Sequence, residues 1–309
     1  MKEEVSHLQR VNVPALDEML GQPFKVLDDG FVRVIDYLGT DESIVQAARV
    51  SYGKGTKKVK QDRELIRYLL RHRHTSPFEM CEIKLHVRVP MDTWRQWIRH
   101  RTASVNEYST RYSVAIESAQ KTAEDGWRLQ ATSNRQGSAG SFPAEVGRDL
   151  TRQEKEIHDL CDQIYKLRLD LGVAREQARK DLPLSTYTEA YWKIDLHNLL
   201  HFLELRMDVL AQEEIRNYAN IIGQEIVSRW CPVTWEAFQD YRQKGLALSE
   251  MEIRIIQACT AGEGDRAVDL AKKYDLLLET DQGLKSTLEL REIEAKLAVL
   301  GIKPPWKIV

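Results

Sequence analysis

The stretch EIKLHVRVPMDTWRQWI, residues 82–98, decides how the surrounding chain folds. Its first eight residues alternate strictly between apolar and polar side chains, which is the period of a strand with one buried face. After Pro90, which is a natural boundary, Trp94, Trp97 and Ile98 fall on one side of a helix. The stretch therefore predicts a half-buried strand that leads directly into a helix with one apolar face.

The next residues, RHRTASVNEYSTR at 99–111, hold three arginines, a histidine and five hydroxyl groups with almost nothing apolar between them. Arginine presents a rigid fork of donors that matches phosphate and carboxylate oxygens, and hydroxyl groups can donate to the oxygens that remain. Because a strand and a helix precede this segment, its side chains start from a rigid support. The segment predicts a site for a phosphate or a planar heterocycle.

The alternatives for this segment are a solvated basic loop and an RNA-binding arm. Glu107 would repel a polyanion, and the whole chain carries 45 Lys and Arg against 47 Asp and Glu, so it has no general basic character. We therefore favour a small discrete anion over nucleic acid. A nucleotide- or RNA-binding regulatory module that uses residues 99–111 stays as the alternative function, and a helical scaffold is a third.

Elsewhere the pattern predicts a strand over residues 31–38, a helix from about residue 41, a helix over 62–73 and a helix over 149–171. The last has a stripe of Leu150, Ile157, Leu160, Ile164, Leu167 and Leu171. Residues 117–147 show no period, so we expect an irregular loop that faces the substrate rather than a plain linker. Beyond residue 245, amphipathic helices follow, with one stripe formed by Leu290, Ile293, Leu297 and Leu300.

The four cysteines lie far apart and form no CxxC pair, so neither a disulfide framework nor a zinc site is expected. No apolar run approaches the length of a membrane span, and the first ten residues lack the apolar core of a signal peptide. We therefore expect a cytoplasmic protein without a membrane partner.

Several segments resemble the flavin-dependent thymidylate synthases. The signature of that family is Arg-His-Arg, seven residues and Ser, which Arg99, His100, Arg101 and Ser109 match. AARVSYG at 47–53, HTSPFE at 74–79, and LHNLLHFLELRMD with AQEEIR within 196–216 resemble family segments in the same order. The resemblance covers roughly residues 31–241. It implies an α+β fold with an antiparallel sheet packed against helices, a catalytic domain at residues 1–245, and a helical extension at 246–309 that acts as a cap or subunit contact.

The resemblance also implies the chemistry, which is reductive methylation of dUMP to dTMP. Methylenetetrahydrofolate, the folate substrate, supplies the carbon, NADPH reduces a bound FAD, and the reduced flavin supplies the hydride. The implied assembly is a homotetramer whose active sites are shared between subunits. A thymidylate synthase without flavin would instead need an activated cysteine. Cys231 precedes Pro232, but no histidine or other base is adjacent to it, so we interpret Cys231 as structural.

The resemblance further implies two sets of site residues. The flavin contacts correspond to Ser76, Arg99, His100, Arg101, Glu107, Asp195, His197 and His201. The dUMP contacts correspond to Gln96, Arg99, Glu107, Tyr108, Ser109, Thr110, Arg111, Arg179 and Arg206. Ser109, Arg111 and Arg179 would serve the phosphate. Arg206 matches the catalytic arginine that bonds the uracil edge and favours ionisation at N3.

Three positions depart from the family pattern. Asp195 and His197 stand where many members have Asn and Arg, so a fixed positive charge becomes a group that titrates near neutral pH. Leu210 precedes Ala211 where the family often has His, which predicts one flavin contact fewer.

Two other readings of these residues are weaker. Ser109 has no base nearby in sequence except His100, so a phosphate contact is favoured over a nucleophile. His197, His201 and Glu204 have the spacing of a metal site, but HExxH is absent and no third His or Cys is near. Flavin contact is therefore favoured, with solvated or internally satisfied histidines as the next alternative and a metal as the weakest.

The spacing along residues 196–207 adds a constraint on this helix. His197, His201 and Glu204 fall on one stripe, and at about 100° per residue Arg206 points almost to the opposite side. If the histidines contact flavin and Arg206 contacts uracil, the helix either bends or serves two sites in an oligomer. The resemblance favours the second arrangement.

Overall fold

The computed structural model describes residues 10–50, 59–131, 138–281 and 283–306. Its contacts divide the chain into two compact units, Met1–Gln243 and Lys244–Val309. The assignment of the first as a catalytic domain, and of the second as a cap or subunit contact, stays a prediction. The strands of the first unit are β1 (Pro23–Val26), β2 (Gly30–Leu38), β3 (Glu82–Pro90), β4 (Ser104–Glu107), β5 (Arg128–Gln130), β6 (Ser138–Ser141) and β7 (Tyr187–Asp195).

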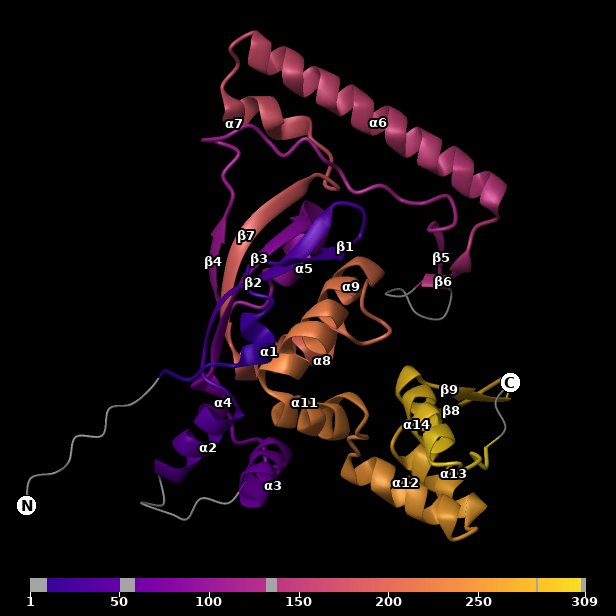
Figure 1. Cartoon of the computed structure of the whole chain (residues 1–309). Helices are drawn as coiled ribbons and strands as arrows, with labels where there is room; N and C mark the ends of the chain where they lie inside the picture. The colour runs from indigo at the N-terminus through magenta and orange to yellow at the C-terminus, as the bar shows by residue number, and fades with distance from the viewer. Residues whose placement is uncertain (1–9, 51–58, 132–137, 282, 307–309) are drawn as a thin grey trace, which may run out of the picture. The chain divides into compact units, whose positions relative to one another are not determined.

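The helices of the first unit are connected to these strands as Figure 1 shows. They are α1 (Pro14–Asp17), α2 (Asp41–Val50), α3 (Val59–Arg71), α4 (Ser76–Glu79), α5 (Met91–Trp97), α6 (Ala144–Asp170), α7 (Arg175–Ala178), α8 (Leu196–Arg206), α9 (Glu213–Ile221), α10 (Ser228–Trp230) and α11 (Pro232–Phe238). A π-helical segment, Ile222–Val227, joins α9 to α10.

Five strands form one antiparallel sheet in the order β1-β2-β3-β7-β4. The centre is the pairing of β3 with β7, which runs from Glu82 opposite Asp195 to Pro90 opposite Tyr187. The predicted alternation of β3 is confirmed, because Ile83 and every second residue to Val89 are buried while the residues between them are half-buried. The α+β fold with an antiparallel sheet and packed helices is therefore confirmed.

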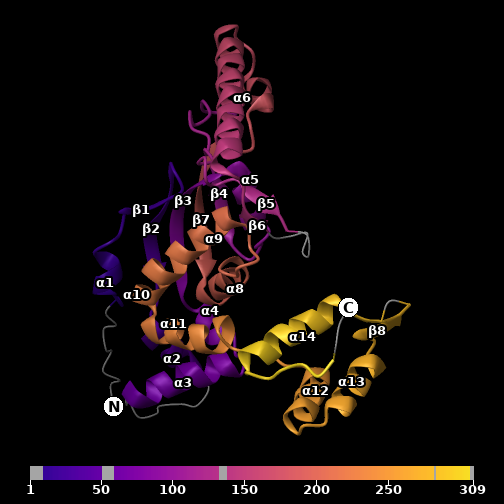
Figure 2. The same ribbon diagram turned by 90° about the vertical axis from the view of Figure 1, so that its right-hand side faces the viewer.

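Helices α8, α9 and α10 lie across one face of this sheet (Figure 2). Trp97 of α5 is fully buried there and contacts Trp192 of β7 and Phe202 of α8, with ring centroids 5.2 and 5.0 Å apart. The predicted strand and helix thus pack as expected, with one exception. Ile98 was expected on the apolar side but is 43% exposed, because α5 ends at Trp97 and the chain turns there.

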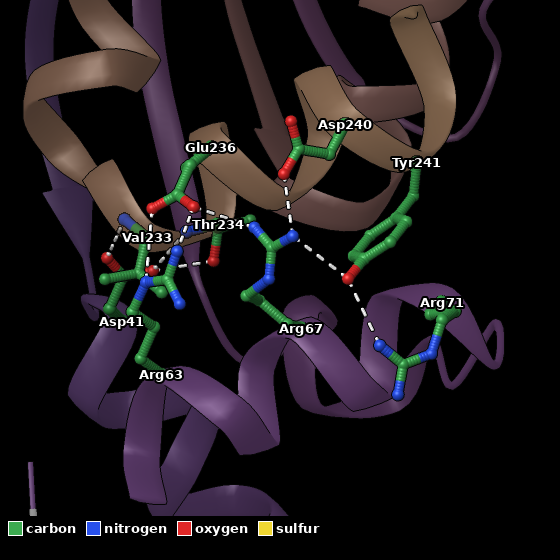
Figure 3. Close-up of polar contacts among 9 residues, drawn as sticks. All are labelled: Asp41, Arg63, Arg67, Arg71, Val233, Thr234, Glu236, Asp240 and Tyr241. Atoms are coloured by element: carbon green, nitrogen blue, oxygen red, sulfur yellow. Dashed lines mark hydrogen bonds and ion pairs between the residues drawn. The ribbon is translucent and has the colours of Figure 1, made fainter. Parts of the chain in front are cut away.

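Asp41, at the start of α2, caps α11 from a distant part of the chain (Figure 3). Its carboxylate accepts hydrogen bonds from the backbone nitrogens of Val233 and Thr234, at 2.8 and 3.1 Å, and from the Thr234 hydroxyl at 2.6 Å. These are amide groups that a helix start leaves without an internal partner. Burial raises the pKa of Asp41, although its three donors act in the opposite direction.

Arginines of α3 continue the same contact (Figure 3). Arg67 pairs with Glu236 at 2.8 Å and with Asp240 at 2.7 Å, and Arg63 also pairs with Glu236. The sequence predicted α3 over residues 62–73, and the structure has it at Val59–Arg71 with Ile66, Leu69 and Leu70 buried. The arginines on this face of α3 therefore form ion pairs with α11 and with the segment that follows it.

Residues 117–147 were expected to be irregular, and this was wrong in part. They contain the short β5–β6 hairpin and the first turn of α6. Residues 132–137 of the segment, like residues 51–53 of the AARVSYG motif, lie outside the described residues. The hairpin escaped detection because three- and four-residue strands give too short a pattern to show a period.

The second unit has its own apolar core. Its elements are α12 (Glu250–Thr260), α13 (Gly264–Lys273), β8 (Leu277–Thr280), β9 (Gly283–Ser286) and α14 (Leu288–Val299). Leu290, Ile293 and Leu297 are buried as predicted, whereas Leu300 follows the end of α14 and is half exposed. The extension is helical as expected but also contains the β8–β9 hairpin, which was not predicted.

Candidate functional site

A cavity of about 910 Å³ lies where α5, the segment after it and α8 meet. The strand–helix stretch at 82–98 delivers its residues, because the buried tryptophans of α5 fix the helix and leave its polar side free. The cavity is lined by Arg95, Gln96, Ile98, Arg99, His100, Arg101, Thr102, Ile194, Asn198, His201, Leu205 and Arg206.

The lining contains four arginines and two histidines and no carboxylate. An arrangement of this kind repels cations and favours an anionic ligand, since each guanidinium offers several donors to oxygen atoms. A phosphate or pyrophosphate, or a heterocycle that gains negative charge, fits this donor set. The sequence predicted a discrete anion site within residues 99–111, and of these only residues 99–102 line this cavity.

Arg206 and His100 are in direct contact within the cavity. Arg206 Nε donates to His100 Nε2 at 3.0 Å, and Arg206 Nη2 donates to the carbonyl of Gln96 at 3.3 Å. Burial, followed by the charge of Arg206 and the proximity of His201, lowers the pKa of His100 to about 4. His100 is therefore neutral at physiological pH, and it accepts the hydrogen bond that holds Arg206.

Arg206 is itself affected by the crowding of charge. Burial, and then the neighbouring Arg99, lower its pKa from the ordinary value for arginine. Arginine nevertheless keeps its proton in proteins, so the cavity holds a fixed cation whose orientation two acceptors define. This is what a site needs if charge that develops on a bound ring is to be stabilised.

The helix that supplies Arg206 is capped by a predicted site residue. Asp195 accepts from the backbone nitrogen of Asn198 at 2.9 Å and from its side-chain amide at 2.7 Å, which makes Asp195 the N-cap of α8. Asn198 lines the cavity, but Asp195 does not. The structure thus gives Asp195 a role in placing α8, and its predicted flavin contact is not part of this cavity.

Of the other residues predicted to contact flavin, some line this cavity and some do not. Arg99, His100, Arg101 and His201 line the cavity, whereas Ser76, Glu107 and His197 are not among its lining residues. Ser76 begins α4, and Glu107 ends β4, where it accepts a 2.9 Å hydrogen bond from Thr188. Leu210 is exposed and lines a different cavity.

The sequence predicted that one straight helix cannot easily present both the stripe of His197 and His201 and the opposite Arg206 to a single site. The structure places His197 outside the cavity but shows His201 and Arg206 within it, although these two lie about 140° apart around an ideal helix. Arg206 is the last residue of α8, and its long side chain reaches His100, whose ring centroid lies 6.1 Å from that of His201. The angle around the helix gives only the direction in which a side chain starts, and the long arginine side chain reaches beyond that direction.

The predicted phosphate residues form a separate group. Arg179, in the turn after α7, donates to the hydroxyl of Thr110, and Arg111 pairs with Glu176 of α7 at 3.2 Å. The Tyr108 hydroxyl donates to the carbonyl of Val114 at 2.8 Å, and Ser109 Oγ accepts from the Arg111 backbone at 3.4 Å. None of these residues is among those that line the first cavity.

The two groups lie at opposite ends of β4. Arg99 to Thr102 precede the strand and Tyr108 to Arg111 follow it, and its four residues span about 13 Å at 3.3 Å per residue. One chain therefore brings Gln96, Arg99 and Arg206 together and keeps them apart from Ser109, Thr110 and Arg179.

Sequence reasoning missed Arg95 and Asn198 as lining residues. The sequence could have indicated both. Arg95 is on the helix that carries the predicted residue Gln96, and Asn198 is on the helix that carries His201 and Arg206. Among the described residues, no group of three His, Cys, Asp or Glu side chains is placed to hold a metal ion. No helix in the described ranges is both long and apolar enough to cross a membrane.

Comparison with known proteins adds to this geometry. A family model described as "Thymidylate synthase complementing protein" matches residues 33–233, which include strands β3, β7 and β4 and helices α5 and α8. A flavin-dependent thymidylate synthase of Ehrlichia ruminantium (strain Gardel) is 46% identical over 295 residues, which is 96% of this chain and 95% of that protein. One from Rickettsia typhi is 50% identical over 268 residues, covering 82% and 91%.

A solved structure is also similar. The UMP/dUMP methylase PolB from Streptomyces cacaoi, bound with 5-Br dUMP, matches with a TM-score of 0.64 and 31% identity, over 71% of this chain and 99% of that one. The chain therefore belongs to the family of flavin-dependent thymidylate synthases, as its sequence motifs predicted.

Proposed function

We propose that this protein makes dTMP by reductive methylation of dUMP, with methylenetetrahydrofolate as carbon donor and FAD reduced by NADPH as hydride donor. The observation that carries the proposal is the cavity at α5 and α8, where four arginines, including both arginines of the family signature, meet without a carboxylate. Membership of the family supports this enzyme over a nucleotide- or RNA-binding regulatory module.

The cavity residues fit a flavin. Arg99 and Arg101 offer donors for the pyrophosphate of FAD or for the pyrimidine edge of its ring, and the apolar side chains of Ile98, Ile194 and Leu205 offer surface for a planar ring. When bound, the flavin supplies the hydride and the protein supplies binding and electrostatics.

The residues of this chain would act on dUMP as follows. Arg206, held by His100 and by the Gln96 carbonyl, presents its guanidinium to the uracil edge and stabilises the negative charge that ionisation at N3 places on the ring. A ring that carries this charge is a better carbon nucleophile. Neutral His100 keeps Arg206 in place without adding a further positive charge.

The phosphate of dUMP would be bound by Ser109, Arg111 and Arg179. Because these residues lie beyond the other end of β4 from Arg206, a complete site would combine one group from one subunit with the second group from another. This separation supports the proposal of shared sites more directly than the helical angle between His201 and Arg206, which line one cavity.

The long helix α6 supports association between copies of the chain. The helix lies beside α7 (Figure 1) and packs there through Tyr165, but Ile157, Leu160, Leu167 and Leu171 are each more than half exposed. With Ile164 these residues recur at intervals of three and four, which is the seam of paired helices. A second copy that covers this stripe fits the proposed homotetramer.

Flavin binding tests the proposal. Protein purified from cells, or reconstituted with FAD, should absorb as a flavoprotein and should bleach on addition of NADPH. Protein that remains colourless after incubation with FAD would exclude a flavin enzyme and would favour the regulatory module.

A further inference from the structure

We propose that Arg128, on β5, is a positioning residue for the cavity, because it fixes Glu214 and Gln212 and through them Gln96. Nothing in the motifs of the family signature includes Arg128. The inference rests on the proposed function, since it concerns how the same site holds dUMP.

The first contact of the chain is an ion pair between β5 and the first turn of α9. Arg128 Nη2 lies 2.8 Å from Glu214 Oε1, and Arg128 Nη1 lies 2.6 Å from Glu213 Oε2. The side chains of Arg128 and Glu214 are 28% and 15% exposed, so solvent screens this pair less than a surface pair. Arginine engages both carboxylates with separate nitrogens, which restricts its rotamer.

The second step runs along the start of α9, where Gln212 is the N-cap residue and Glu213 and Glu214 are the first two residues of the helix. Burial alone raises the pKa of Glu214, but hydrogen bonds from its own backbone, from Arg128 and from Gln212 outweigh burial and leave the pKa below its ordinary value. Glu214 is therefore ionised, and its ion pair with Arg128 fixes the first turn of α9, which begins directly after Gln212. Without Arg128, the carboxylate would have fewer donors in a site that is mostly buried.

The third contact reaches the cavity. Gln96 donates from its side-chain amide to Gln212 Oε1, and the Gln96 carbonyl accepts from Arg206. Gln96 lines the cavity of Arg206, whereas Arg128 and Gln212 line a separate cavity of about 640 Å³. The two glutamines thus lie between the two cavities. The part of the larger cavity that Gln96 lines therefore depends on Arg128 of the β5–β6 hairpin.

Removal of the Arg128 guanidinium should loosen a side chain that binds substrate without touching the reacting atoms. Arg128→Met keeps the length and apolar stem of the side chain. We expect it to raise the KM and the Kd for dUMP about tenfold and to leave kcat within about twofold, as for an interaction made equally in the ground and transition states. Arg128→Lys should recover part of the affinity.

The matched control is Arg148→Met. Arg148 also connects this part of the chain by an ion pair, with Glu124 at 3.4 Å, but the two side chains are 67% and 53% exposed and neither residue lines the cavity of Arg206. Its KM and Kd for dUMP should stay within twofold of wild type. Circular dichroism on all variants reports whether they are folded.

A double-mutant cycle separates positioning from a general loss of stability. If Arg128 acts through Gln96, the double variant Arg128→Met, Gln96→Ala should bind dUMP no more weakly than Gln96→Ala alone. Independent, multiplicative effects would overturn the inference, as would an unchanged KM and Kd in Arg128→Met. Should Arg128→Met fail to fold, Glu214→Gln, which keeps the shape of the side chain, must show the same non-additivity with Gln96→Ala. A wild-type protein that makes no dTMP would instead refute the proposed function.

Discussion

Replacement of Arg206 by alanine is expected to remove almost all dTMP formation while FAD stays bound. Two acceptors hold the Arg206 guanidinium at 3.0 and 3.3 Å, so it is oriented before substrate arrives. An oriented donor of this kind, aimed at charge that develops in the transition state, contributes on the order of 10²–10³ in kcat, or about 3–4 kcal/mol. We expect a loss at the upper end, because Arg206 is charged and partly buried.

The assay measures dTMP formed from dUMP, methylenetetrahydrofolate and NADPH at saturating concentrations, with flavin absorbance recorded on the same sample. Arg206→Lys keeps the charge but not the fork of donors, so its activity should lie between those of wild type and Arg206→Ala. Arg229→Ala is the control, because Arg229 lies in the same unit and pairs on the surface with Glu225 one helical turn away. It should retain full activity.

Retention of most dUMP-dependent activity by Arg206→Ala would refute the assignment of Arg206 to the uracil. Loss of flavin together with activity would also refute it, because the arginine would then act on the cofactor.

Four further predictions follow from the same geometry. Ser109→Ala should raise the KM for dUMP more than it lowers kcat, and complete loss of turnover at saturating dUMP with FAD bound would instead indicate a nucleophile. Arg206→Ala and Arg179→Ala, each inactive, should regain part of the activity when mixed under conditions that exchange subunits; inactivity despite demonstrated exchange would argue against shared sites. Because the pKa of His100 is lowered to about 4 in the folded protein, the unfolded chain binds a proton first as pH falls below about 6.5, so this residue reduces stability between about pH 6.5 and 4. His100→Gln should lessen that loss in urea titrations, by a slope of at most about 1.4 kcal/mol per pH unit, and an unchanged slope would contradict it. Asp41→Ala should lower the free energy of unfolding by about 1–3 kcal/mol, since it leaves the start of α11 without its acceptor; a cost below about 0.5 kcal/mol would show that water replaces the cap.

Periodic segments of the sequence predicted their elements well. The alternation in β3, the apolar side of α5 and the stripe of α3 each report a local pattern that one buried face imposes. The hairpins β5–β6 and β8–β9 were missed because such short strands depend on pairing with a partner rather than on their own pattern. The stripe of α6 was correctly placed on a helix, but its exposure was not foreseen, because the sequence does not show whether the partner is in the same chain.

The sequence identified most of the polar residues that line the cavity, but it did not show which of the predicted site residues lie together. The motif Arg99-His100-Arg101 identified residues that line the cavity, yet only the fold shows that Arg206 meets His100 and that Ser109 and Arg179 lie elsewhere. Asp195 was expected to contact flavin, and the structure shows it as the cap of α8, a role that depends on where the strand before it ends. Side-chain length and strand ends, which decide these contacts, are not part of a sequence pattern.

The measurement that tests the central claim most directly is the transfer of a labelled carbon from methylenetetrahydrofolate to dUMP, with NADPH present and FAD either bound or removed. We expect labelled dTMP only when FAD is bound, and restoration of its formation when FAD is returned to the stripped protein. Label transfer that is equally fast without flavin, or none from folded protein that holds FAD and dUMP, would contradict the account.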